Sequence, residues 1–335
     1  MENHTKILQD LHGRAHAYLR ISLIERCNLR CTYCMPEQGV KLSPKSHLMT
    51  YEEIFKIAKT FVDNGVTKIR LTGGEPLIRK DFPVILEKLA TLPVELSITS
   101  NAVIIDKFIA VLKANGVKKI NVSLDSLDEN KFKHITRRHE FKKVYNNILL
   151  LIKEGFTVKL NAVLIKNFND NEIIDFINLT KNHPISVRFI EFMPFDGNKW
   201  DISKMVSYAN VMACVNQTFS KNRVLRLQDA PNDTSKNYKI EGYKGSFAII
   251  SSVTNPFCDS CNRLRLTANG QLKNCLFSAE ESDLLTTLRA GKSIEPIINK
   301  AVKAKFKVRG GMNTVKKLQE PKRHTNNRSM ITIGG

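Results

Sequence analysis

Short apolar runs rich in β-branched residues recur along the first half of the chain, and most are followed by an amphipathic stretch with helical spacing. Six of these runs are predicted strands: Tyr18–Ile24, Lys68–Thr72, Val94–Thr99, Lys119–Leu124, Thr157–Ile165 and Ile185–Glu191. Their alternation with helices implies a buried parallel sheet with helices outside it. The pattern therefore predicts an α/β fold. An incomplete, TIM-like (β/α)6 barrel fits six units better than a doubly wound sheet, although spacing alone does not separate the two.

The alternating pattern degrades after about Asp201. A helix-like stretch over 204–217 leads into Asn- and Asp-rich turns around 232–237, and a few short strands and then helices follow. We therefore expect two parts. Residues 1–220 would form the partial barrel, and residues 221–335 a smaller C-terminal α+β lobe that closes its open side.

Composition narrows the classes of protein to consider. The chain has 335 residues, 42% of them apolar and 25% charged, which is enough for a large core and excludes wholesale disorder. Seven cysteines in a long chain without a secretory segment at Met1–Arg20 do not resemble a disulfide framework. No apolar run approaches the length of a membrane span. We expect a cytoplasmic, reduced protein without a membrane partner.

The formal net charge is +20, from 52 Lys and Arg against 32 Asp and Glu. A basic balance favours polyanionic partners such as nucleic acid, anionic membranes or phosphorylated small molecules. Residues 300–328 hold ten of the basic residues and one acidic residue, which is +9 of the +20. Solvated lysines explain such an excess equally well, and we expect this segment to be mostly solvated surface.

Three cysteines with CxxxCxxC spacing follow the first predicted strand, at Cys27, Cys31 and Cys34. Thiolates on one tight loop suit an iron–sulfur cluster or zinc. A structural zinc would need a fourth ligand, and no His or further Cys is close in sequence. A cubane [4Fe–4S] cluster held by three cysteines keeps one open iron, to which a small molecule can bind.

A second group of three cysteines follows in the C-terminal part, at Cys258, Cys261 and Cys275. No His lies between them, so a structural zinc would need a distant ligand such as Cys214. A second cubane cluster, whose open iron could hold a substrate, is the more specific interpretation. Cys214 lies in an apolar helical stretch and is expected to be a small buried hydrophobe.

Two arginines and a glycine pair accompany the second group. Alternation along a strand would put Arg263 and Arg265 on one face beside the cluster. Guanidinium groups there could hold a phosphate or stabilise developing charge, and a pair of solvated arginines is the simpler alternative. The last residues, Gly334 and Gly335, are slim enough to enter a site, although a terminal Gly-Gly is usually a frayed end.

The first cysteine group resembles the signature of the radical S-adenosylmethionine (radical SAM) enzymes. Tyr33, just before the third cysteine, matches the family's aromatic residue beside the adenine, and Thr72–Pro76 matches its glycine-rich second motif. The resemblance implies that S-adenosylmethionine binds the open iron. One electron from the cluster then cleaves it and gives a 5′-deoxyadenosyl radical.

Motifs along the whole chain resemble those of the GTP 3′,8-cyclases of molybdenum cofactor biosynthesis. They include Asn121–Asp125, Arg188–Met193, Phe257–Arg265 and the final Gly-Gly. The resemblance implies that the radical removes the 3′ hydrogen of GTP, that C3′ then bonds to C8, and that the cyclised radical is reduced. It also implies two [4Fe–4S] clusters, with guanine on the open iron of the second.

The same resemblance assigns roles to individual residues. The implied S-adenosylmethionine contacts are Tyr33, Gly74, Ser123 and Met193, with Arg188 as a further contact. The implied GTP contacts are Arg20, Arg70, Thr99, Lys159, Arg263 and Arg265. The implied metal ligands are Cys27, Cys31, Cys34, Cys258, Cys261 and Cys275. The implied catalytic residues are Cys27, Cys31, Cys34, Arg263, Arg265, Gly334 and Gly335. No Walker-type loop exists, so triphosphate binding is expected to rest on scattered Arg and Lys side chains.

The implied partners are GTP, an electron donor and a downstream cyclic pyranopterin monophosphate synthase that accepts the product, with no nucleic acid; a homodimer is compatible with the sequence. Ala102 departs from the family's common Asn-Gly, so the backbone at that turn can differ.

Two alternatives stay open. One is a tRNA- or peptide-modifying radical SAM enzyme with an auxiliary cluster. The other is a non-catalytic metal–thiolate protein with a basic, nucleic-acid-binding tail, which leaves Gly73–Pro76 without a purpose.

Overall fold

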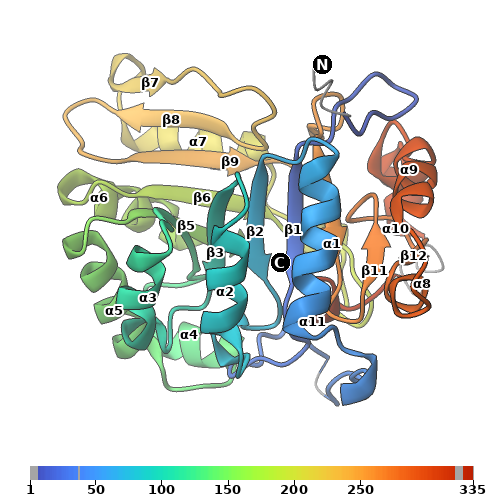
Figure 1. Cartoon of the computed structure of the whole chain (residues 1–335). Helices are drawn as coiled ribbons and strands as arrows, with labels where there is room; N and C mark the ends of the chain where they lie inside the picture. The colour runs from blue at the N-terminus through green and yellow to red at the C-terminus, as the bar shows by residue number, and fades with distance from the viewer. Residues whose placement is uncertain (1–6, 37, 321–326, 335) are drawn as a thin grey trace.

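The computed structural model describes residues 7–36, 38–320 and 327–334. Its strands form one sheet in the order β12-β11-β10-β1-β2-β3-β4-β5-β6-β9-β8-β7 (Figure 1). The central six strands are parallel and are those that the sequence predicts: β1 (Tyr18–Ser22), β2 (Lys68–Thr72), β3 (Glu95–Ser100), β4 (Lys119–Ser123), β5 (Thr157–Leu164) and β6 (Ser186–Glu191). The α/β fold with an incomplete (β/α)6 barrel is therefore confirmed.

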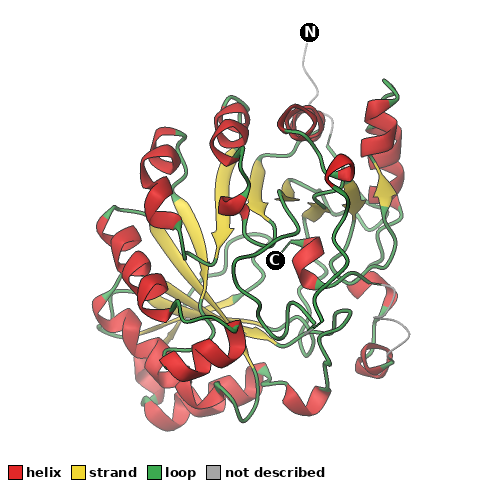
Figure 2. Cartoon of the chain, turned by 90° about the horizontal axis from the view of Figure 1, so that it is seen from below, coloured by secondary structure: helices red, strands yellow, loops and turns green. Residues whose placement is uncertain are grey.

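Helices follow the central strands and cover the outer face of the curved sheet (Figure 2). They are α1 (Tyr51–Asp63), α2 (Phe82–Ala90), α3 (Ile109–Ala114), α4 (Glu129–Thr136), α5 (Phe141–Lys153) and α6 (Ile173–Asn182). A capping box opens α1: the Glu53 N–H donates to the Thr50 hydroxyl oxygen, and the Thr50 N–H donates to the Glu53 carboxylate. The apolar face of α1, with Ile54, Ile57 and Phe61, is buried in the main core.

The C-terminal part extends this sheet at both edges. On one side β10 (Arg263–Leu266) lies parallel to β1, and on the other β9 (Ser246–Ile250) lies parallel to β6. The outer strands are antiparallel: β7 (Val224–Arg226), β8 (Lys236–Ile240), β11 (Gln271–Lys273) and β12 (Ser282–Asp283). The division near residue 220 stays a prediction, because one continuous sheet runs through both parts.

Short helices complete the C-terminal part. They are α7 (Tyr208–Thr218), α8 (Leu285–Arg289), α9 (Glu295–Lys303), α10 (Val315–Gln319) and α11 (Met330–Ile333). Gly334, directly after α11, lies against Ser22 and Thr72 at the ends of β1 and β2. The chain therefore returns to the carboxyl ends of the barrel strands. Within the described ranges, no helix is long and apolar enough to cross a membrane.

Two local expectations are refined. Cys214, expected to be buried, is half-buried on α7 and packs against the main core. Ala102 takes a left-handed backbone with φ of 60°, so an alanine holds the turn that glycine would adopt freely. Its N–H donates to the Ser100 hydroxyl, and its carbonyl accepts from the Asn147 amide, which compensates for the strain.

Candidate active site

The first three cysteines lie on a tight loop that follows β1. The Cys34 N–H donates to the Cys31 carbonyl at 3.0 Å. Two nitrogen donors face the Cys27 sulfur: the main-chain N–H of Leu29 at 3.4 Å and the Asn101 amide at 3.5 Å. Donors directed at a sulfur stabilise a metal-bound thiolate, so the surroundings of Cys27 suit an iron–sulfur cluster.

The glycine-rich loop after β2 packs directly on this cysteine loop. A Cβ at Gly74 would lie 2.1 Å from the Arg26 carbonyl oxygen, so only glycine permits the contact. The Gly74 N–H donates to the Ile24 carbonyl at 2.7 Å. The buried Glu75 carboxylate accepts from the Asn101 N–H at 2.7 Å and thereby joins this loop to the end of β3. The motif thus holds the cysteine loop in place.

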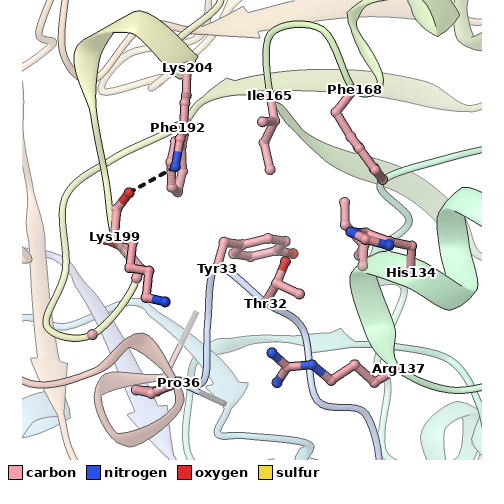
Figure 3. A pocket seen from close by; sticks show the side chains of 13 residues that line it. Thr32, Tyr33, Pro36, His134, Arg137, Ile165, Phe168, Phe192, Lys199 and Lys204 are labelled. Atoms are coloured by element: carbon pink, nitrogen blue, oxygen red, sulfur yellow. Dashed lines mark hydrogen bonds between the residues drawn. The ribbon is translucent and has the colours of Figure 1, made fainter.

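Tyr33, which belongs to the cysteine loop, lines a pocket that the sequence did not reveal (Figure 3). Its hydroxyl donates to Asp125 at 2.7 Å, and burial together with that carboxylate raises the pKa of Tyr33. The opposite wall includes Ile165 and Phe192, which directly follow β5 and β6, and Phe168. The active sites of barrels are formed by residues at the carboxyl ends of the strands. The position of Ile165 and Phe192 directly after two strands is therefore the sequence signal that could have predicted this pocket.

The second group of cysteines meets the predicted GTP residues in one cavity. Cys258 and Cys261 precede β10, and the antiparallel pairing of β10 with β11 returns Cys275 to the same place. The cavity holds about 1040 Å³ of empty space, its open mouth included. Its lining includes Cys258, Cys261, Cys275, Arg20, Arg70, Thr99, Arg188, Met193, Arg263 and Arg265.

Strand register explains why the arginines gather there. Arg20 of β1 is paired with Arg265 of β10 on one side and with Arg70 of β2 on the other. Arg263 lies two residues before Arg265, so both side chains face the cavity. Burial and then the charges of neighbouring arginines lower the pKa of Arg70 to about 10, although Tyr18 opposes this shift. Buried like charges are costly without an anion, so the row suits a polyanionic ligand.

Several buried polar atoms around this cavity have no hydrogen-bond partner among the residues that the structure describes. They are Arg20 Nε, Arg188 Nε, Arg263 Nη2, Arg309 Nε, Asn121 Oδ1, Asn161 Oδ1 and Asn274 Oδ1. Such atoms are costly unless a ligand or water satisfies them. The set offers both donors and acceptors, as a nucleotide requires.

The remaining predicted residues lie at or beside this centre. Ser123 ends β4, and Lys159 of β5 lies outside the cavity lining. Burial and then Arg188 lower the pKa of Lys159 to about 8. The Gly334 carbonyl accepts from the Arg265 guanidinium at 2.6 Å, which brings the tail into the site. Gly335 lies outside the described residues.

No three His, Cys, Asp or Glu side chains within the described part of the chain are grouped to hold a metal ion. A single zinc requires its ligands around one centre, at about 2.0–2.3 Å. The cysteines of a cubane cluster bind different irons, so their sulfurs lie farther apart. The absence of such a group in the described residues therefore applies to sites for a single metal ion and not to cubane clusters.

Comparison with known proteins identifies the family. Residues 21–180 match the Radical SAM superfamily, and residues 185–310 match Molybdenum Cofactor Synthesis C. The chain is 47% identical to "GTP 3′,8-cyclase, mitochondrial" of Arabidopsis thaliana, over 98% of this chain and 84% of the relative. It is 40% identical to "GTP 3′,8-cyclase" of Listeria welshimeri, over 89% and 90%. The chain belongs to the GTP 3′,8-cyclase family.

Other relatives are longer. "Molybdenum cofactor biosynthesis protein 1" of Drosophila melanogaster is 44% identical over 90% of this chain, which spans 54% of that protein. The chain thus covers about half the length of some curated relatives. SuiB of Streptococcus suis has the same fold, with a TM-score of 0.60 over 90% of this chain and 68% of that chain, at 15% identity.

Membership in the cyclase family decides between the alternatives left by the sequence. A radical SAM enzyme uses a [4Fe–4S] cluster and S-adenosylmethionine, and the donors around Cys27 fit that cofactor. The interpretations as a tRNA- or peptide-modifying enzyme and as a non-catalytic metal–thiolate protein find no support in these relatives.

The N-terminal segment of this cyclase clamps the loop of the second cysteine group. The Arg14 guanidinium donates to the Cys258 carbonyl at 2.8 Å and to the Lys307 carbonyl at 2.9 Å. Asp10 holds Arg14 through a 2.6 Å ion pair and also contacts the buried His16 at 3.1 Å. The clamp thus ties the start of the chain to both segments around the second site.

We expect the stability of the metal-free chain to fall as the pH drops from about 6.5 to about 4. Burial, followed by the charge of Lys305, lowers the pKa of His16 from 6.5 to about 4. Between these values the unfolded state binds a proton that the folded state does not, so stability is present above the window and is lost below it. The loss over the whole window is on the order of 3 kcal/mol.

Urea unfolding across this window checks the expectation. His16→Gln should flatten the pH dependence, because it removes the titrating ring. His12→Gln, at an exposed position in the same segment, should keep the wild-type slope. Identical slopes for wild type and His16→Gln would contradict the assignment.

The basic segment over 300–328 is solvated surface only in part: Lys300, Lys303, Lys307 and Lys316 are exposed, as expected, but other cations are not. Lys305 and Arg309 are buried, with 3% and 4% of their surface exposed. Arg328 is half-buried and forms a bidentate ion pair with Glu281. Residues 321–326 lie outside the described part. Long-range contacts around the second cysteine loop cover Lys305 and Arg309, and local composition does not report such contacts.

Proposed function

We propose that this protein converts GTP to (8S)-3′,8-cyclo-7,8-dihydroguanosine 5′-triphosphate in molybdenum cofactor biosynthesis, as a radical SAM lyase. The observation that carries the proposal is the cavity in which three cysteines meet buried arginines with unsatisfied donors. A triphosphate supplies the negative charge that such a row needs. The names of the Arabidopsis and Listeria relatives support the same reaction.

In this proposal the substrate lies between the strands and the second cysteine group. Arg20, Arg70 and Arg265, adjacent in register, bind the phosphates. Lys159, Thr99, Arg188 and Arg263 complete the GTP site, and Arg188 would also contact S-adenosylmethionine. The free oxygens of Asn121 and Asn161 accept hydrogen bonds from the ribose or guanine.

Cys258, Cys261 and Cys275 would hold a second [4Fe–4S] cluster that binds guanine. The fit rests on their place in one cavity and on the state of Cys261. Burial raises the pKa of Cys261, but the charges of Arg263 and Lys305 outweigh it and lower the pKa to about 6. A thiolate is the form that ligates iron, so this residue is prepared for metal binding.

The first cysteine group would hold the cluster that binds S-adenosylmethionine. When bound, this pair of cofactors supplies the 5′-deoxyadenosyl radical that takes the ribose 3′ hydrogen. Tyr33, Gly74, Ser123 and Met193 would position S-adenosylmethionine between the two cysteine groups. Exclusion of water from the reacting centre once both ligands are bound would protect a reactive substrate radical.

The test is anaerobic reconstitution with iron, sulfide, GTP, S-adenosylmethionine and a reductant, followed by product identification. We expect the cyclised nucleotide and 5′-deoxyadenosine, and about eight irons per chain from two clusters. About four irons with one zinc, or an uncyclised product, would contradict the proposal.

The proposal extends to the partners. The reaction needs a one-electron donor, and its product would pass to a cyclic pyranopterin monophosphate synthase. Neither nucleic acid nor membrane is proposed as a partner, and a homodimer is proposed as the assembly. The proposed location is cytoplasmic, although the Arabidopsis relative is named mitochondrial.

A further inference from the structure

Two buried cations of the C-terminal segment contact the second cysteine group. The Lys305 ammonium lies 3.5 Å from the Cys261 sulfur and donates to the Arg263 carbonyl at 2.8 Å. Lysine is rarely this buried without a partner of opposite charge. A thiolate at Cys261 is such a partner, and the Arg263 carbonyl fixes the ammonium against it.

Arg309 approaches the same group from the other side. Its backbone has φ of 41°, an unusual value for a residue other than glycine, and its main-chain N–H interacts with the Cys258 thiol. The guanidinium donates to the Val253 carbonyl at 2.6 Å and lines the cavity, and its Nε has no hydrogen-bond partner among the described residues. The turn is thus arranged around the second site.

The next residue shows why this turn is fixed. A Cβ at Gly310 would lie 2.9 Å from the Ser278 nitrogen, close behind Cys275. The contact leaves no room for a side chain, and φ of 59° also favours glycine. The close packing of Gly310 therefore helps to hold Arg309 in its strained conformation.

The first cysteine group is faced by buried carboxyl groups, in addition to the two N–H donors directed at the Cys27 sulfur. The buried carboxyl of Glu75 faces Cys27, and the carboxyl of Asp125 faces Cys31 and Cys34. Cations and N–H groups directed at cluster sulfurs favour the reduced, more negative cluster, whereas carboxylates oppose it. The two sites therefore differ in the buried side chains around them, with cations beside the second group and carboxyl groups beside the first.

We propose that Lys305 and Arg309 raise the reduction potential of the second cluster above that of the first, so that a one-electron donor reduces the second cluster first. The inference rests on the proposed function, which places a cluster at Cys258, Cys261 and Cys275. Both residues act through the cysteine ligands, so they are positioning residues.

An anaerobic redox titration of the full, iron-loaded chain, followed by electron paramagnetic resonance, tests the proposal. In Lys305→Met, the ratio of reduced to oxidised second cluster at a fixed potential should fall roughly tenfold, a shift of about 59 mV for one electron. Lys305→Arg keeps the charge and should stay near wild type. Lys303→Met, the matched control on an exposed position of α9, should change neither cluster.

Arg309→Gln provides a second variant if Lys305→Met does not fold, since its amide can still donate to Val253. It should lower the same potential and leave the first cluster unchanged. An unshifted potential in the folded variants would overturn the inference, as would loss of the second cluster from both. A wild-type chain with only about four irons would instead refute the proposed second cluster itself.

Discussion

Replacing Cys258 with serine is expected to abolish GTP cyclisation while S-adenosylmethionine is still cleaved. Cys258 lines the arginine-rich cavity, whereas Cys27, Cys31 and Cys34 lie on a separate loop after β1. Losing a ligand of the second cluster would remove the guanine site but not the first cluster. Removing a hydrogen-bond partner of a metal ligand typically lowers activity roughly 10–100-fold. Removing the ligand itself should lower product formation by more than that.

The measurement is anaerobic quantification of 5′-deoxyadenosine and of the cyclised nucleotide in one reaction. Cys214→Ser is the matched control, because Cys214 lies half-buried on α7 outside both cysteine groups. It should keep both products and the full iron content. If cyclisation survived in Cys258→Ser, the second group would not be the substrate site.

Deleting Gly334 and Gly335 is expected to stop cyclisation and to leave both clusters and the fold intact. The deletion removes the carbonyl that accepts from the buried Arg265 guanidinium. Arg265 would then lose its orientation toward the triphosphate. The buried Ile331 and Ile333 of α11 remain in place, so the core loses little. The cyclisation rate, the iron content and the unfolding midpoint check the three parts of this expectation.

Two alanine substitutions test whether cyclisation depends on where the tail lies or only on the flexibility of glycine. Gly334 has φ of 87°, and a Cβ there would lie 2.5 Å from the Thr72 hydroxyl, so Gly334→Ala should displace the tail and reduce cyclisation. Gly291 has a similar φ of 70° with open space around it. Gly291→Ala should cost a little stability, roughly 1 kcal/mol, without loss of activity. If the protein without Gly334 and Gly335 were fully active, the tail would be only a frayed chain end without a role in cyclisation.

The central sheet could be predicted from the sequence because each strand is a local run rich in apolar and β-branched residues. Five of the six predicted strands match to within one residue at each end, and β1 ends two residues early at Ser22. The positions of β9 and β10 could not be predicted in this way. Their partners, β6 and β1, are far away in sequence, and only tertiary packing selects which edge a short strand joins.

The candidate site shows the same limit. Cysteine spacing and arginine alternation are local signals, and they led to residues that the structure brings into one cavity. Lys305 and Arg309 gave no such signal, because both look like ordinary surface cations in their own segment. Their burial depends on contacts with a loop around Cys258 that lies elsewhere in the chain.

The flanking of β1 and β6 by C-terminal strands has a consequence for synthesis on the ribosome. Strand β1 emerges first, yet its neighbour β10 begins only at Arg263. During most of translation the nascent barrel therefore carries two unpaired strand edges, which are templates for pairing with other chains. A premature stop before β9 would leave both edges permanently open. Such fragments should aggregate, whereas a chain that lacks only its last residues should stay folded and inactive.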